Sequence, residues 1–124
     1  MNQEQIKGDL KNIGARLQRA TGYSLKGLRA AFRNEQAFRL EVYALLIVVP
    51  AGLILGDGGV EKSLLIGSWL IVMIAELMNS AVEAVVDRIG SEPHELSGRA
   101  KDVASAAVMI ALFLTVLTWL LLIF

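Results

Sequence analysis

Residues 76–102 read ELMNSAVEAVVDRIGSEPHELSGRAKD and place acids and bases between two apolar runs. Residues 64–75, which precede this stretch, carry no charge, and neither do residues 103–124, which follow it. Ionisable groups therefore occur within what would otherwise be a membrane-spanning segment. A carboxylate near the centre of a bilayer costs about 2.5–3.5 kcal/mol, so acids retained there usually have a function. Because Glu76 and Glu83 occupy such positions, we predict a small membrane enzyme.

The composition fits a single membrane domain. The chain has 124 residues, 55% of them hydrophobic, and a mean hydropathy of +0.56, which is typical of proteins with several spans. The absence of cysteine excludes disulfides and thiolate chemistry. No signal-peptide pattern precedes the first apolar run, so we expect that run to be retained as a span.

Three apolar runs predict three membrane-spanning helices. Residues 64–86 and 104–124 reach the roughly 20 residues that a span requires. Residues 42–55 are too few, so we expect their helix to start upstream, near Asn34 or Glu35. The fold class predicted for this part of the chain, residues 34–124, is therefore an all-α membrane domain with three spans.

The connections between these spans predict their orientation. Residues 56–59, GDGG, are a strong turn signal, and the polar residues 90–98 form the second connection. Three basic residues flank the second connection, namely Arg88, Arg99 and Lys101, whereas a single lysine lies near the first. The positive-inside rule places the N-terminus and the second connection in the cytoplasm, and the C-terminus on the other side.

Residues 1–33 predict a helical region on the membrane surface. Four apolar residues recur at the spacing of one helical face, namely Ile6, Leu10, Ile13 and Leu17. Basic side chains surround them, and a basic amphipathic helix is attracted to anionic lipid. Residues 21–24, TGYS, predict a break before a second, shorter helix. The alternative is an N-terminal arm whose charges only set the topology.

One face of the second predicted span carries the candidate chemistry. Glu76, Asn79 and Glu83 are spaced i, i+3, i+7 and share a helical stripe. The two carboxylates lie about 10 Å apart along the helix axis. Mg²⁺ takes one or two carboxylates together with substrate phosphates, which suits the shallower Glu83 and, from the first span, Glu35. The deeper Glu76 suits proton transfer. The alternative is that these acids form structural ion pairs.

Two further side chains could contact phosphate. Lys101, at the start of the third predicted span, can neutralise charge on a transferring group, although interfacial lysines also occur without function. His94, the only histidine, lies in the second connection and could hydrogen-bond phosphate or remain solvated. No P-loop or protein-kinase motif is present, which excludes those soluble kinase folds.

Three stretches closely resemble the bacterial integral-membrane diacylglycerol kinase family, namely GYSLKGLRAAFRNEQAFRLE, NSAVEAVVDRIG and HELSGRAKD. The resemblance extends from about Ala20 to the last span. It implies a homotrimer in the bacterial inner membrane, with a surface helix and three spans per subunit, a periplasmic C-terminus and active sites shared between subunits. It also implies transfer of the γ-phosphate of MgATP to the hydroxyl of 1,2-diacylglycerol, with phosphatidate as the product and no nucleic acid as a partner.

The resemblance also implies roles for individual residues. Its catalytic positions are Glu76, Asn79 and Lys101, with Glu76 as the base. Its Mg²⁺-binding carboxylates are Glu35 and Glu83. The ATP-binding positions that it implies are Arg16, Tyr23, Glu35, Glu83, Glu92, His94, Lys101 and Asp102. Those that it implies for the lipid substrate are Ser24, Arg29, Arg39, Glu41, Glu76 and Ser105.

Two positions depart from the family pattern. Leu25 stands where the family has an aromatic residue, and Pro93 stands where it has a tyrosine. The first departure affects how the lipid is held at the interface, and the second affects the adenine side of the nucleotide site.

Two other functions fit parts of the sequence. An undecaprenol kinase would use the same acidic stripe on a long prenyl alcohol, although the HELSGRAKD and GYSLKGLRAAF stretches favour diacylglycerol. A non-enzymatic membrane oligomer would line a pore with these acids. The polar groups gather toward the predicted cytoplasmic half, which favours a one-sided active site.

Overall fold

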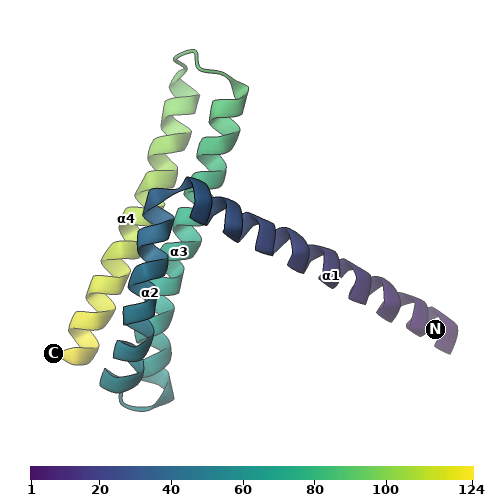
Figure 1. Cartoon of the computed structure of the whole chain (residues 1–124), viewed down its shortest axis with the longest axis horizontal. Coiled ribbons are helices and arrows are strands. Elements are labelled where there is room, and N and C mark those ends of the chain that lie inside the picture. Colours follow the sequence, from purple (N-terminus) through teal and green to yellow (C-terminus); the bar gives the residue numbers. More distant parts are fainter. The chain divides into compact units, whose positions relative to one another are not determined.

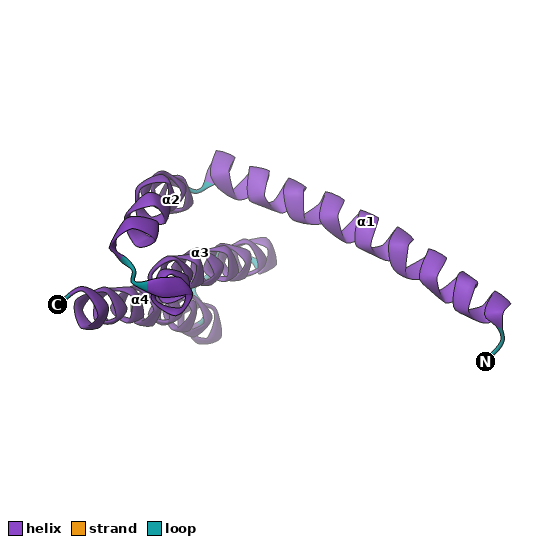
Figure 2. Cartoon of the chain, turned by 90° about the horizontal axis from the view of Figure 1, so that it is seen from below, coloured by secondary structure: helices purple, strands orange, loops and turns teal.

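The computed structural model describes residues 1–124 and contains four helices joined by short connections (Figure 1). The helices are α1 (Gln3–Asn34), α2 (Gln36–Leu55), α3 (Gly58–Ile89) and α4 (Glu95–Ile123). Figure 2 shows that all of the regular structure is helical. The chain divides into two compact units, Met1–Asn34 and Glu35–Phe124.

The first unit consists of the single continuous helix α1, which has 32 residues. Its start is capped by Asn2, whose Oδ1 accepts a hydrogen bond of 2.8 Å from the backbone N–H of Gln5. Four apolar residues of α1 were predicted to share one helical face, and all four are exposed in this chain. They are Ile6, Leu10, Ile13 and Leu17.

The break predicted at residues 21–24 is wrong, because α1 continues through them. Thr21 donates its hydroxyl to the carbonyl oxygen of Leu17 at 2.8 Å, a bond that a helical threonine makes to the preceding turn. Gly22 costs about 1 kcal/mol relative to alanine in a helix. That cost is too small to interrupt a helix with so many favourable residues on either side.

In the second unit, α2, α3 and α4 are each long and apolar enough to cross a membrane, as predicted. α2 begins at Gln36, which confirms that the first span starts upstream of its apolar run. α3 has 32 residues and therefore extends about 48 Å, well beyond a hydrocarbon core of about 30 Å. The acids in its C-terminal half thus lie toward one end of the unit.

A tight turn connects α2 to α3. Gly58 has a φ of +79°, a conformation that glycine adopts without steric cost. The backbone N–H of Asp57 donates to Oε2 of Glu61 at 2.6 Å, which satisfies a donor at the start of α3. The GDGG sequence therefore forms the turn that it predicts.

α3 packs against both α2 and α4, and α3 and α4 form a long antiparallel pair (Figure 1). Leu65 and Val72 on α3 are fully buried. A Cβ atom at Gly52 of α2 would lie 2.8 Å from Cγ1 of Ile66, so α2 and α3 approach closely at this point. Small residues at such crossings allow close packing where no hydrophobic effect drives association.

Hydrogen bonds from side chains to helix carbonyls join the three spans. Thr115 of α4 donates to the carbonyl oxygen of Ser68 at 2.9 Å, and Nε1 of Trp119 donates to that of Leu65 at 3.1 Å. Nε1 of Trp69 on α3 donates to the carbonyl oxygen of Glu41 on α2 at 3.0 Å. α3 is therefore held to both of its neighbours by polar contacts as well as by packing.

Candidate active site

The polar stripe of α3 faces the interior of the unit. Glu76 and Asn79 are only 8% and 9% exposed, and Glu83 is half-buried. Nδ2 of Asn79 donates to Oε1 of Glu83 at 3.3 Å, and Asn79 lies about one helical turn from Glu76 on the same stripe. The amide of Asn79 therefore lies between the two carboxyl groups along the stripe and is bonded to that of Glu83.

Acids from the start of α2 join this stripe. Glu41 is 9% exposed and lies close enough to Glu76 to interact with its charge. Glu35, the residue that precedes α2, also interacts with the charge of Glu76. Three carboxyl groups, from α3, from α2 and from the residue that precedes α2, thus lie within electrostatic range of Glu76. The polar stripe and these two α2 acids are called the acid cluster below.

Several buried polar atoms in this region have no hydrogen-bond partner in the chain. They are Oε1 of Glu41, Oδ1 of Asn79 and Oγ of Ser80. Leaving such an atom unpaired costs about 1–3 kcal/mol, so natural proteins rarely retain one without a use for it. These atoms are available to a ligand or to a neighbouring molecule.

No group of three or more His, Cys, Asp or Glu side chains converges tightly enough to hold a metal by itself. A magnesium ion that accompanies a nucleotide does not require such a group, because it keeps waters and phosphate oxygens as ligands. Glu35 and Glu83 are hard oxygen donors, and both lie within electrostatic range of Glu76. They therefore fit the ligand type and number expected of a nucleotide-bound Mg²⁺.

A pocket of about 680 Å³ lies where α3 and α4 meet their connecting loop. This volume is within the range of pockets that bind small molecules. Three residues predicted to bind ATP line it, namely Glu92, His94 and Lys101, and Asp87 lines it too. We call this space the hairpin pocket.

Lys101 is paired across the hairpin pocket. Its Nζ lies 2.7 Å from Oδ1 of Asp87, which joins α4 to α3. The two side chains are 42% and 67% exposed, so the ammonium group remains open to solvent. Asp87, to which the sequence analysis assigned no role, is therefore the partner of the lysine that was predicted to be catalytic.

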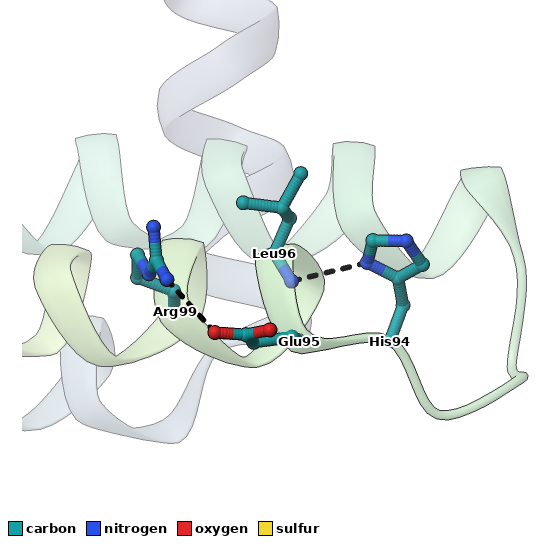
Figure 3. Close-up of polar contacts among 4 residues, drawn as sticks. All are labelled: His94, Glu95, Leu96 and Arg99. Carbon is teal, nitrogen blue, oxygen red and sulfur yellow. Dashed lines mark hydrogen bonds and ion pairs between the residues drawn. The ribbon is translucent and has the colours of Figure 1, made fainter.

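His94 caps the N-terminus of α4 (Figure 3). Its Nδ1 accepts a hydrogen bond of 3.0 Å from the backbone N–H of Leu96, which assigns the ring proton to Nε2. One turn later, Arg99 pairs with Glu95 at 2.9 Å. The imidazole therefore has a structural role that the sequence alone did not indicate, and its Nε2 is left as a donor.

The other predicted site residues are distributed along the helices. Asp102 and Ser105 are exposed on α4 and do not line the hairpin pocket, whereas Arg39 is half-buried on α2. The predicted site residues on α1 are all exposed. They are Arg16, Tyr23, Ser24 and Arg29. Of the positions that depart from the family pattern, Leu25 is exposed on α1 and Pro93 lines the hairpin pocket.

Comparisons with known proteins identify the family of this chain. Residues 22–123 match the family model described as prokaryotic diacylglycerol kinase. The chain is 58% identical over 104 residues to a diacylglycerol kinase of Escherichia coli K12. This alignment covers 84% of this chain and 85% of that protein. It is 55% identical over 100 residues to a diacylglycerol kinase of Haemophilus influenzae, with 81% of this chain and 85% of that protein covered. It is 46% identical over 104 residues to a diacylglycerol kinase of Pseudomonas aeruginosa, with 84% of this chain and 85% of that protein covered. The chain therefore belongs to the prokaryotic diacylglycerol kinase family.

Proposed function

We propose that this protein is a diacylglycerol kinase of the bacterial inner membrane, which phosphorylates 1,2-diacylglycerol to phosphatidate with ATP and Mg²⁺. The family supplies the lipid substrate and the class of reaction. The observation that carries the mechanism is the buried Glu76, which lies in a span beside Asn79 and close to three further carboxyl groups. Such a carboxylate is retained within a span at considerable cost, which is a mark of function.

In the proposed reaction Glu76 acts as the general base. The carboxylate accepts the proton of the lipid hydroxyl while the hydroxyl oxygen forms a bond to the γ-phosphorus of ATP. The bond from that phosphorus to the oxygen bridging to the β-phosphate breaks, and ADP leaves. Asn79 orients the carboxyl group through its amide. Phosphoryl transfer depends largely on such positioning and on neutralisation of charge.

The nucleotide is proposed to bind at the cytoplasmic end of the bundle. The hairpin pocket offers Lys101 as a cation and His94 Nε2 as a donor. Mg²⁺, held by Glu35 and Glu83 when bound, would neutralise phosphate charge. Lys101 would stabilise the charge that develops on the transferring group.

The active form is proposed to be a homotrimer with shared sites, whose N-terminus and α3–α4 loop face the cytoplasm and whose C-terminus faces the periplasm. The unpaired buried atoms of Glu41, Asn79 and Ser80 support a site completed from outside the chain. In this arrangement α1 lies on the inner leaflet, which would cover its exposed apolar side chains.

An assay with two lipids tests the proposal. Detergent-purified protein with MgATP is offered dioleoylglycerol and undecaprenol in parallel, and phosphorylated lipid is followed. We expect phosphatidate from the wild type and a rate about 10²- to 10⁴-fold lower from Glu76→Gln, because that variant lacks the base. Product from undecaprenol alone would reassign the substrate, and no lipid product would refute kinase activity.

A further inference from the structure

We propose that Trp69 is a positioning residue for the lipid side of the active site, an inference that rests on the proposed kinase function. Its indole Nε1 donates to the backbone carbonyl oxygen of Glu41 at 3.0 Å. This bond connects residues 28 positions apart and joins α3 to α2. It therefore constrains how α2 is rotated and placed against α3 at the level of the acid cluster.

The bond reaches Glu41 through its main chain and leaves its carboxyl group free. Glu41 is 9% exposed, and its Oε1 has no partner in the chain. The same residue lies near Glu76. Trp69 can thus hold the Glu41 side chain beside Glu76. The carboxyl oxygens of Glu41 stay free to accept a hydrogen bond from the substrate hydroxyl or from a neighbouring molecule.

Trp69 is also placed correctly along α3 for this purpose. It precedes Glu76 by seven residues, so the two share a helical stripe about 10 Å apart along the axis. Rotation of α2 about its own axis would turn Glu41 away from that stripe. The indole bond opposes this rotation directly. Apolar packing between two helices in lipid favours one rotation of α2 over another only weakly.

The chain contains a matched control in Trp119. This indole also donates to a helix carbonyl, that of Leu65 at 3.1 Å, but it joins α4 to α3. Both tryptophans line the same apolar groove of about 580 Å³. The two residues therefore share chemistry, bond type and packing environment, and differ in that only the acceptor of Trp69 belongs to the acid cluster.

The experiment compares Trp69→Phe with Trp119→Phe in lipid kinase assays. We expect Trp69→Phe to lower kcat/KM for dioleoylglycerol about three- to tenfold, the effect of losing one hydrogen bond, with the KM for ATP unchanged. Trp119→Phe should retain the lipid kinetics of the wild type although it loses a similar bond. In a Glu41→Gln background the Trp69→Phe effect should largely disappear, because the indole acts through Glu41.

Equal lipid kinetics for the two variants, or an undiminished Trp69→Phe effect in the Glu41→Gln background, would overturn the inference. If no lipid is phosphorylated, the positioning role of Trp69 can still be tested by measuring the distance between α2 and α3. Because the chain has no cysteine, spin labels can be attached at cysteines introduced at Leu46 of α2 and Ile74 of α3. Trp69→Phe should broaden the α2–α3 distance distribution and Trp119→Phe should not. An unchanged distribution would refute the positioning role, whereas absence of lipid kinase activity in the wild type would refute only the proposed function.

Discussion

At the scale of single residues, the ion pair with Asp87 orients the side chain of Lys101, which lies at the end of a span. The two groups lie 2.7 Å apart across the α3–α4 pair, and both side chains are substantially exposed. Solvent screens exposed ion pairs, so this contact contributes little to folding stability. Its effect is instead to aim the ammonium group into the hairpin pocket, where phosphate is proposed to bind.

The variant Asp87→Ala tests this role. We expect a fall in kcat of about ten- to a hundredfold with little change in thermal stability, because Lys101 is proposed to act on the transferring phosphate and a small displacement of such a group has effects of this size. Arg99→Gln is the control, since Arg99 does not line the pocket and its exposed ion pair with Glu95 joins two residues of α4 rather than α3 and α4. Steady-state rates and melting curves in detergent measure both quantities. A loss of activity in Asp87→Ala that merely follows a loss of stability would contradict the positioning role.

At the scale of the helices, α3 is the element on which the site depends. It carries Glu76, Asn79 and Glu83, and it is bonded to α4 through Thr115 and to α2 through Trp69. The Thr115 hydroxyl lies 2.9 Å from the carbonyl oxygen of Ser68 and 3.3 Å from that of Ala111 in its own helix. This shared hydroxyl gives the α3–α4 contact a defined register.

Thr115→Val measures the contribution of that contact. Valine has nearly the same shape but lacks the hydroxyl, so we expect a loss in the free energy of unfolding of about 0.6 kcal/mol, and no more than about 1.7 kcal/mol. Thr118→Val on the same helix is the control, since Thr118 has no hydrogen bond to another helix. Unfolding in mixed micelles with increasing detergent denaturant provides the measurement. Equal losses for the two variants would show that the Ser68 bond does not stabilise the interface.

At the scale of the whole molecule, the chain leaves several polar atoms and many apolar side chains without partners of its own. Three buried polar atoms near the acid cluster have no partner within the chain, and no group of protein side chains converges to hold a metal by itself. Most of the large apolar side chains on the three spans are exposed, as they are in a protein surrounded by lipid and by copies of itself. Both features are consistent with the proposed homotrimer.

Mixed oligomers test whether sites are shared. Glu76→Gln and Glu35→Ala subunits should each be inactive alone, and co-refolded mixtures should regain measurable lipid kinase activity. The reason is that a shared site can take its base from one subunit and its metal ligand from another. Each parent refolded alone is the control. Mixtures as inactive as either parent would show that each site is built from one chain.

The sequence predicted much of the fold and part of the site. The three spans, the early start of α2 and the turn at residues 56–59 follow from local properties, namely apolar length and glycine content. The stripe of Glu76, Asn79 and Glu83 follows from helical spacing alone, and the structure confirms that these residues share one interior face. The predicted break in α1 failed because TGYS is compatible with a helix as well as with a turn.

The sequence by itself determined that the chain is helical, that three helices can cross a membrane, and which face of α3 carries the acids. These properties depend on neighbours along the chain. Only the tertiary structure decided that Asp87 pairs with Lys101, that Trp69 bonds to the main chain of Glu41, and that His94 caps α4. The first two contacts depend on how the helices are rotated against one another, and the third depends on how the loop enters α4. In each case several partners were compatible with the sequence, and three-dimensional packing selected one.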